Sequence, residues 1–305
     1  MSLAIVFPGQ GSQSVGMMQG FSSPLILKLY QEASEIVGED LFKLINEENE
    51  LLNQTIYTQP IMLIAGYACW QLMYENNQNI DIKYVSGHSL GEITALLASE
   101  VLDLQSALKI VKKRAQLMQD AVPTGVGAMA AILGLEDEAV EEICRDLQNQ
   151  GVIEPVNYNS PGQLVIAGEK NIIEASIDIF KQKGAKRALI LPVSVPSHCS
   201  LMTDAAHEFS EYCNEFTFNE PKYQLIQNVN AKIETNPENI KINLAKQLHH
   251  PVLWTKTIQI IEQDNNVKKI VECGPGKVLS GLNKRIINRE GLDLQSINND
   301  ESLNI

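Results

Sequence analysis

The chain has 305 residues, 44% of them hydrophobic, which is enough for one large domain with an insertion or for two modest domains. Its formal net charge of −13 disfavours non-specific nucleic-acid binding, so any anionic partner must meet a local basic patch. The five cysteines are scattered without C-x-x-C spacing, which argues against a disulfide framework or a zinc site and fits a reducing compartment.

Strands and helices alternate in the first part of the chain. Residues 4–7 are typical of a short buried strand, and residues 24–37 of a helix that begins after Ser23. A second helix is predicted to begin near Thr58, with Pro60 in its first turn, and it contains the most apolar window of the sequence. That window is too short to span a bilayer, and the N-terminus lacks the basic region of a signal peptide. We therefore expect a soluble cytoplasmic protein that binds no membrane.

The stretch VSGHSLGE, residues 85–92, follows a predicted strand at 83–87. After it, apolar residues recur at helical spacing, so the pattern is strand, tight turn, helix. Ser89 lies in the turn, between two glycines at G-x-S-x-G spacing, and a further helix is predicted to follow Asp103.

The middle of the chain has a different order of predicted strands and helices. Its predicted elements follow the order strand, helix, strand, strand, helix, strand, which is the order of the ferredoxin-like unit. We place this unit at residues 124–193, as an insertion in a larger α/β domain made of residues 1–123 and 194–305.

The last part of the chain returns to the larger domain. We expect a helix at 201–216, a strand near 223–229, a helix that ends within 244–250, a strand at 268–273 and a closing helix. The tail after Arg289 is polar and is expected to be frayed.

Ser89 is the first candidate for chemistry. A serine hydroxyl attacks only when a base takes its proton. At a strand-to-helix turn its oxygen is exposed, and the following N–H groups suit a developing oxyanion. The alternative is a serine that only caps the helix, but the strand and helix around it favour a nucleophile.

The base must be a histidine, and His198 is the best placed. It lies in PSHC, where the chain re-enters the larger domain, although a structural histidine explains this position equally well. His88 precedes Ser89 directly, so on an extended strand it points to the opposite side and could steady the turn from behind. The remaining histidines are expected to be solvated or to cap a helix C-terminus: His207, His249 and His250.

Arg114 lies on the apolar stripe of a predicted helix, one turn before Met118. A guanidinium aimed at the interior needs an anion, and it matches a carboxylate in a bidentate manner. The residues alone slightly favour an internal pair with Asp or Glu, or a side chain that reaches out to solvent, over a substrate carboxylate held beside Ser89.

Two glycine-rich turns, at 8–16 and 273–277, lack the spacing of dinucleotide-binding and phosphate-binding loops. The first could lend the Gln10 backbone N–H to an oxyanion. Basic side chains form two clusters that are either solvated surface or landing sites for phosphates or an acidic partner. The clusters are Lys181, Lys183, Lys186 and Arg187, and then Lys277, Lys284 and Arg285.

Several motifs occur together along the chain: FPGQGSQ, GHSLGE, QDAVPTGVGAMAAILGL, VNYNSPGQLVIAG, LPVSVPSHC and GPGKVLSGLNKRI. With them the chain closely resembles the malonyl-CoA:acyl carrier protein transacylases, either of fatty acid synthesis or acting in trans on polyketide synthases. The resemblance runs from Phe7 to about Ile286. It implies an α/β fold with a hydrolase-like large domain, a parallel sheet and an inserted ferredoxin-like small domain, as the element order also predicts.

The resemblance assigns the central roles. It implies that Ser89 is the nucleophile that becomes malonylated and that His198 is the general base and acid. It also implies that the Gln247 carbonyl orients His198 and that Arg114 binds the malonyl carboxylate. These implications strengthen the interpretations of His198 and Arg114 that the residues alone left open.

Other residues follow from the same resemblance. The backbone N–H groups of Gln10 and Leu90 would stabilise the oxyanion. Asn157 would lie near the cleft, and we group it with Arg114, Met118 and His88 as substrate-binding residues. The basic residues expected to dock the carrier protein or CoA are Lys183, Lys186, Arg187, Lys277, Lys284 and Arg285.

We therefore predict a ping-pong acyltransferase that moves a malonyl group from CoA to the phosphopantetheine thiol of an acyl carrier protein. CoA is a substrate, no cofactor or metal is bound, and the protein is expected to be a monomer. The alternatives are an acyl-thioester hydrolase with the same Ser–His machinery and a non-catalytic carrier-docking scaffold. Glu100, where the family more often has glycine, and Ile93, where an aromatic is common, leave a polyketide role open.

Overall fold

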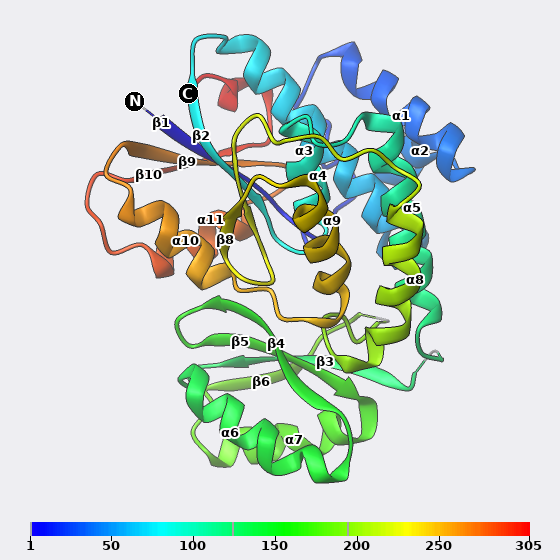
Figure 1. The fold of residues 1–305 in the computed structure, drawn as a ribbon, viewed down its shortest axis with the longest axis vertical. Coiled ribbons are helices and arrows are strands. Elements are labelled where there is room, and N and C mark those ends of the chain that lie inside the picture. The colour runs from blue at the N-terminus through cyan, green and yellow to red at the C-terminus, as the bar shows by residue number, and fades with distance from the viewer. Residues whose placement is uncertain (1, 124, 194) are drawn as a thin grey trace.

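Two β-sheets organise the fold, and each carries its own helices (Figure 1). The computed structural model describes residues 2–123, 125–193 and 195–305. In Figure 1 the smaller sheet lies below the larger one, with helices on its outer side. The predicted α/β class, with a hydrolase-like larger part and a small inserted part, is confirmed.

The larger part contains six strands and most of the helices. The strands are β1 (Ser2–Phe7), β2 (Asp81–Gly87), β7 (Gln224–Gln227), β8 (Lys232–Glu234), β9 (Val267–Cys273) and β10 (Asp293–Ile297). The helices are α1 (Pro24–Val37), α2 (Leu41–Asn46), α3 (Thr55–Asn76), α4 (Gly91–Ala98), α5 (Leu104–Asp120), α8 (Thr203–Cys213), α9 (Pro237–Lys246), α10 (Trp254–Gln263) and α11 (Val278–Ile286). Short 3₁₀ turns are η1 (Leu51–Asn53), η3 (Ser200–Met202), η4 (Gln247–His249) and η5 (Asp300–Leu303).

The larger sheet has the strand order β10-β9-β1-β2-β7-β8. Its neighbouring strands are parallel except β7 and β8, which are antiparallel. Successive side chains of a strand point to opposite faces. Accordingly, Leu3, Ile5 and Phe7 of β1 pack with α1, α3, α4, α5 and α8, whereas Ala4 and Val6 pack with α10 and α11. Both faces of this sheet are therefore covered, as is usual for parallel strands.

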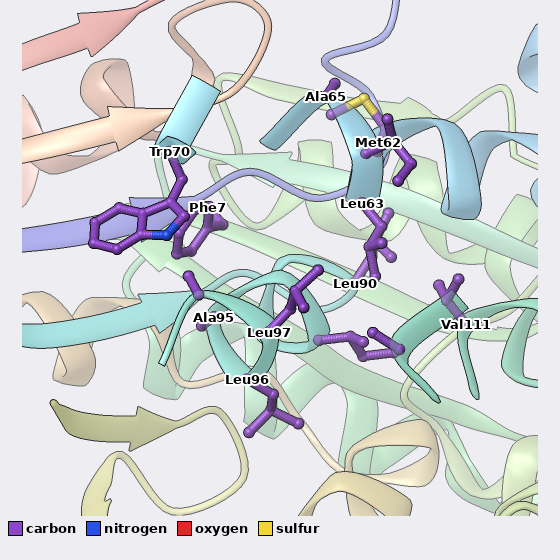
Figure 2. Packing of buried hydrophobic residues seen from close by; sticks show 14 of the residues in the cluster. Phe7, Met62, Leu63, Ala65, Trp70, Leu90, Ala95, Leu96, Leu97 and Val111 are labelled. Carbon is purple, nitrogen blue, oxygen red and sulfur yellow. The ribbon is translucent and has the colours of Figure 1, made fainter. Parts of the chain in front are cut away.

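Helix α4 lies inside the larger hydrophobic cluster, and all of its residues are buried. It contacts α3, α5, β1 and β2. Figure 2 shows part of this cluster, with Leu63 from α3, Leu97 from α4 and Val111 from α5 among its side chains. Because α4 begins two residues after Ser89 and α5 carries Arg114, this packing fixes the backbone under both side chains.

The smaller part contains β3 (Gly127–Leu133), α6 (Asp137–Leu147), η2 (Gln148–Gln150), β4 (Ile153–Ser160), β5 (Gln163–Glu169), α7 (Lys170–Gln182) and β6 (Arg187–Ile190). Its sheet is antiparallel, with the order β4-β5-β3-β6. One face packs against α6 and α7. The other face carries Met129, Val156 and Val165, which pack around Cys199 from the larger part. This second face therefore forms one wall of the interface between the two parts.

Several elements differ from the sequence expectations. Helix α3 begins at Thr55, three residues before the predicted start, so Pro60 lies in its second turn. The sequence analysis did not predict α2, α10 or β8. The expectation of a frayed tail is wrong, because β10 pairs in parallel with β9 and Asn299 caps the turn that follows it. The tail is ordered because β9 offers it an open edge and Leu303 packs into the core.

Glu100 lies two residues after the end of α4. Its φ is 63°, which is left-handed backbone that favours glycine. The carboxylate is exposed and forms an ion pair with Lys222.

In the described residues, no helix combines the length and the apolar character that crossing a bilayer requires. All five cysteines are buried and unpaired.

Candidate active site

The turn that carries Ser89 is a strained connection between β2 and α4. Ser89 has φ 52°, which is left-handed backbone and unfavourable for a residue with a Cβ. The flanking glycines are required by close contacts. A Cβ on Gly87 would lie 1.9 Å from the Gly91 carbonyl oxygen, and a Cβ on Gly91 would lie 2.1 Å from the Phe7 carbonyl oxygen. The G-x-S-x-G spacing therefore presents Ser89 at a tight corner where larger neighbours cannot fit.

Two buried amides hold this turn in place. Asn228 Oδ1 accepts a hydrogen bond from the Ser89 backbone N–H at 2.7 Å, and Asn228 Nδ2 donates to the Gly87 carbonyl at 2.7 Å. Gln247 Nε2 donates to the Ser89 carbonyl at 3.0 Å. Sequence analysis missed Asn228, since only the tertiary fold brings the end of β7 next to the turn.

His198 and Ser89 are in hydrogen-bond contact. Ser89 Oγ lies 2.7 Å from His198 Nε2, and His198 Nδ1 lies 2.6 Å from the Gln247 carbonyl oxygen. A carbonyl oxygen can only accept, so Nδ1 carries the proton and Nε2 is free to accept the serine proton. Burial, reinforced by the charge of Arg114, lowers the pKa of His198 to about 3, so the imidazole is neutral near neutral pH. This is the protonation state that a general base needs.

Arg114 reaches the same point from α5. Its Nη2 donates to Ser89 Oγ at 3.2 Å and to Gln247 Oε1 at 2.7 Å, and its Nη1 donates to Gln59 Oε1 at 2.8 Å. The side chain is fully buried, and its Nε has no partner in the described chain. Burial lowers the pKa of the guanidinium to about 10, so it remains charged at neutral pH.

The internal ion pair that the sequence slightly favoured for Arg114 is not formed. Among the described residues, no carboxylate lies within 4.0 Å of its guanidinium. Its direct partners are neutral amides and a hydroxyl, so a buried positive charge faces the serine without a directly bonded anion. Gln59, which sequence analysis missed, lies on α3 and shares the positioning of Arg114 with Gln247.

A cavity of about 130 Å³ opens in front of Ser89 and His198. Its lining comes from both parts of the chain: Gln10, Thr55, His88, Ser89, Met129, Asn157, Leu191, Val193, Val195, Ser197 and His198. The Asn157 Oδ1 is buried and lacks a partner within the described chain, so it is available to a bound molecule. The mostly apolar walls with a few convergent polar groups are typical of a small-molecule site.

His88 lines the cavity and does not lie behind the turn. Its Nε2 is 2.8 Å from Asn159 Oδ1, and its ring centroid is 5.5 Å from that of Trp254. Burial lowers the pKa of His88, which favours the neutral ring. His88 therefore links the nucleophile turn to β4 of the smaller part.

Gln10 lines the same cavity as Ser89, and Leu90 is the next residue after that serine. Leu90 is the residue before α4, and Gln10 is at the cavity wall, where its Nε2 donates to Thr55 Oγ1 at 3.3 Å. Within residues 2–123, 125–193 and 195–305, neither backbone N–H has a hydrogen-bond acceptor. Both N–H groups are thus left without a partner among the described residues, and the Leu90 N–H is at the start of α4.

Met118 does not reach the cavity. Its side chain is 1% exposed and packs in the core, where its sulfur accepts a hydrogen bond from Gln59 Nε2 at 3.6 Å. The sequence pattern correctly predicted that Met118 lies on the buried side of α5. At this position, however, the side chain points into the core and not into the cavity.

The other histidines are distant from the reacting atoms. His207 is exposed, as expected. His250 Nδ1 lies 3.1 Å from the Lys246 carbonyl oxygen at the end of α9, whereas His249 Nδ1 lies 3.4 Å from Thr203 Oγ1. His250 thus contacts the helix C-terminus as predicted, and His249 contacts α8 instead.

The two basic clusters meet at the turn between β4 and β5. Arg285 Nη1 donates to Gln163 Oε1 at 2.7 Å. Beside it, the Gly134 N–H donates to the Gly162 carbonyl at 2.7 Å, and the Lys186 side chain lies over Gly134, where an added Cβ would be 2.6 Å from its Cγ. Lys186 of the first cluster and Arg285 of the second therefore border the same turn, one from each part of the chain.

In the part of the chain that the structure describes, no three His, Cys, Asp or Glu side chains are grouped in a way that could hold a metal ion.

The geometry defines a serine acyltransferase site, and comparison with known proteins agrees. The family described as "Acyl transferase domain" matches residues 4–288, so the chain belongs to this family. Within it, the chain is 44% identical to the malonyl CoA-acyl carrier protein transacylase of Haemophilus influenzae over 297 residues, 96% of this chain and 94% of that protein. It is also 44% identical to the Escherichia coli protein of that name over 287 residues, 93% of this chain and 92% of that protein.

Solved structures give the same result. An acyl carrier protein S-malonyltransferase from Vibrio cholerae has a TM-score of 0.93 at 46% identity, covering 99% of this chain and 98% of that one. A malonyl-transacylase in complex with a type II polyketide synthase acyl-carrier protein has a TM-score of 0.95 at 42% identity, with the same coverage. The resemblance to malonyl-CoA:acyl carrier protein transacylases that the motifs indicated is confirmed.

Proposed function

We propose that the chain transfers a malonyl group from CoA to the phosphopantetheine thiol of an acyl carrier protein through an acyl-enzyme on Ser89. His198 Nε2 takes the Ser89 proton as Oγ attacks the thioester carbonyl carbon. The oxyanion of the tetrahedral intermediate accepts hydrogen bonds from the Gln10 and Leu90 N–H groups. When the C–S bond breaks, the proton on His198 passes to the CoA sulfur, and the malonyl ester remains on Ser89.

The position of Arg114 is the observation that favours a malonyl group. Its guanidinium is fully buried and charged, its Nη2 lies 3.2 Å from Ser89 Oγ, and among the described residues it has no carboxylate partner. The carboxylate of a malonyl ester is one methylene away from the ester carbonyl, so it falls within reach of Arg114. A buried arginine without an anion is costly, and a substrate carboxylate offsets that cost when it binds. An uncharged acyl group offers no such compensation.

The second half-reaction uses the same groups in reverse. The carrier thiol gives its proton to His198 and attacks the malonyl ester, and the proton then returns to Ser89 Oγ as the C–O bond breaks. The basic residues Lys183, Lys186 and Arg187, with those of α11 across the β4–β5 turn, are the side chains we propose to dock an acidic carrier protein or the CoA phosphates. A shared basic surface at the junction of the two sheets would direct either thioester arm into the same cleft.

We further propose how the chain is organised around this chemistry. Residues 1–123 and 194–305 form the hydrolase-like catalytic domain, and residues 124–193 form the inserted subdomain that closes one wall of the cleft. The enzyme uses CoA as a substrate and no resident cofactor or metal, and it acts as a monomer. The buried, unpaired cysteines support an enzyme of the reducing cytoplasm.

A hydrolase could use the same serine and histidine. It would have no use for a buried guanidinium aimed at the acyl group, and the relatives are transacylases. The site therefore supports transfer over hydrolysis.

The test is to incubate the protein with a mixture of malonyl-CoA, methylmalonyl-CoA and acetyl-CoA and to measure the mass of the intact acyl-enzyme. We expect a malonyl adduct that persists until holo-carrier protein is added, because water is a poor competitor for the ester. Ser89→Ala should carry no adduct. A malonyl adduct on this variant, or rapid loss of the adduct in the absence of carrier protein, would contradict the proposal.

A further inference from the structure

Glu92 is a buried carboxylate that the proposed reaction does not use. It lies on α4, close after Ser89, and is 0% exposed. Its Oε2 accepts a hydrogen bond from the Asn228 backbone N–H at 2.8 Å, and its Oε1 accepts one from Gln227 Nε2 at 3.1 Å. A buried charge costs free energy unless hydrogen bonds or an opposite charge compensate for the lost water, so the partners of Glu92 must account for its position.

Asn228 connects this carboxylate to the nucleophile. Glu92 fixes the Asn228 backbone, while the Asn228 side chain holds both sides of the nucleophile turn, at the Gly87 carbonyl and at the Ser89 N–H. The Ser89 backbone is in the left-handed region, so it stays there only while its surroundings hold it. The Glu92–Asn228 contact is therefore a support for the strained turn.

The same contact reaches the rest of the site through Gln247. Gln247 Nε2 donates to Asn228 Oδ1 at 3.3 Å and to the Ser89 carbonyl at 3.0 Å. The carbonyl and Oε1 of Gln247 are the acceptors for His198 and Arg114. A shift of Asn228 would thus disturb the base and the guanidinium as well as the nucleophile.

We propose that Glu92 is a positioning residue whose ionised carboxylate, acting through Asn228, holds the Ser89 turn in its reactive geometry. The inference rests on the proposed acyl-enzyme chemistry, because its effect is measured as the rate at which Ser89 is acylated.

The protonation state of Glu92 decides whether this support is complete. Both carboxylate oxygens accept hydrogen bonds, and a proton on either one removes the negative charge and turns part of the acceptor capacity into a donor, which weakens these bonds. Burial raises the pKa of Glu92 to about 7, against the lowering effects of its hydrogen bonds and of the Arg114 charge. Arg114 on α5 is the charged group that acts on it, whereas its partners on β7 and η4 are neutral amides.

The expected pH dependence follows from this. Above neutral pH Glu92 is ionised and the turn is held, and as the pH falls through about 7 the carboxylate takes up a proton and acylation slows. Titration of His198 does not produce this change, because burial keeps its pKa at about 3. A fall in acylation rate on the acid side of neutral pH (the acid limb) that disappears in Glu92→Gln therefore reports on Glu92.

The experiment measures single-turnover acylation by malonyl-CoA, quenched and weighed as intact protein, from about pH 5 to about pH 9. Glu92→Gln keeps the shape of the side chain but supplies an NH₂ where an acceptor is needed. We expect it to be acylated about tenfold to about a hundredfold more slowly than the wild type at high pH, the value of one hydrogen bond to a charged group. We also expect its rate to be flat through the window in which the wild-type rate changes.

Glu272→Gln is the matched control. Glu272 is 1% exposed, and its oxygens accept from the Leu279 and Ser280 N–H groups and the Ser280 hydroxyl. It is likewise a buried carboxylate with several donors, but it holds the start of α11 and not the nucleophile turn. This variant should be acylated at a near wild-type rate, and its rate should still fall below neutral pH as the wild-type rate does.

Asn228→Ala gives a second, independent measurement. It leaves Glu92 ionisable but removes the side chain that connects it to the turn, so it should also be slow and lack the acid limb. Combining it with Glu92→Gln should add little further loss, since the two act through one connection. An unchanged acid limb in either single variant, or fully additive losses, would overturn the inference. Failure of the wild type to acylate Ser89 at all would instead refute the proposed function.

Discussion

Replacing Arg114 by methionine should remove most of the preference for malonyl over acetyl groups. The change deletes the only positive charge that contacts Ser89 in the described structure and keeps an unbranched apolar stem in place of the first part of the arginine side chain. It also leaves the acceptors Gln59 Oε1 and Gln247 Oε1 without their donor, which weakens the site for every substrate. The ratio of the two acylation rates within one variant cancels that shared loss.

The magnitude follows from burial. Arg114 is 0% exposed, so a carboxylate that pairs with it is also largely removed from water. Breaking a buried pair by removing one partner costs about 3 to about 5 kcal/mol. The lower value corresponds to a loss of about a hundredfold or more in relative rate, and neutral acyl-CoA should lose much less.

The assay is a competition between malonyl-CoA and acetyl-CoA for the enzyme, read as the ratio of the two acyl-enzymes by intact mass at early times. Lys113→Met is the matched control, because Lys113 is the preceding residue of α5 and pairs with Glu208 at the surface. It should leave the ratio unchanged. If Arg114→Met keeps the wild-type ratio, the guanidinium does not bind the acyl carboxylate, and the choice of a malonyl substrate loses its support.

Two further predictions concern other surfaces of the molecule. Charge reversal at Lys186 and Arg187 should raise the KM for carrier protein several-fold with little change in self-acylation, because these residues lie on the basic surface outside the cavity. Equal effects on both half-reactions would contradict docking there. Glu100→Gly should raise the free energy of unfolding by about 0.5 to about 1 kcal/mol. Left-handed backbone costs a residue with a Cβ about 1 to about 2 kcal/mol, glycine loses about 0.5 to about 1 kcal/mol more in chain entropy on folding, and the exposed ion pair with Lys222 contributes little. Lower stability in a urea titration would show that the ion pair outweighs the strain.

The two buried charged residues of the site have different roles: Arg114 faces the acyl group, and Glu92 holds the nucleophile turn. Arg114 has no directly bonded anion and is held only by amides and a hydroxyl, which leaves its charge for the substrate. Glu92 is fully used by backbone and amide donors and cannot capture the guanidinium directly. A direct ion pair between them would fill the position that the acyl carboxylate needs.

Local sequence determined those features that depend on near neighbours. The strand, turn and helix around Ser89 were predictable because two glycines and a change of apolar period lie within a few residues of it. The order of the smaller part was predictable because each of its elements carries its own pattern. Arg114 was correctly placed on a buried face, since helical periodicity fixes the face of a residue before its partners are known.

Tertiary structure decided which of these residues meet. His198 contacts Ser89 across 109 residues of sequence, and Gln247 reaches the same turn across 158. No local pattern marks Asn228 or Gln59, and the motif that contains Glu92 does not indicate its partners, because each of the three acts through a hydrogen bond that exists only when distant strands and helices are packed. The polar tail became a strand for the same reason: β10 has few apolar residues of its own, and its order comes from the free edge of β9. Sequence periodicity reports burial and local conformation, whereas hydrogen bonds between distant segments are set by the packing of the whole chain.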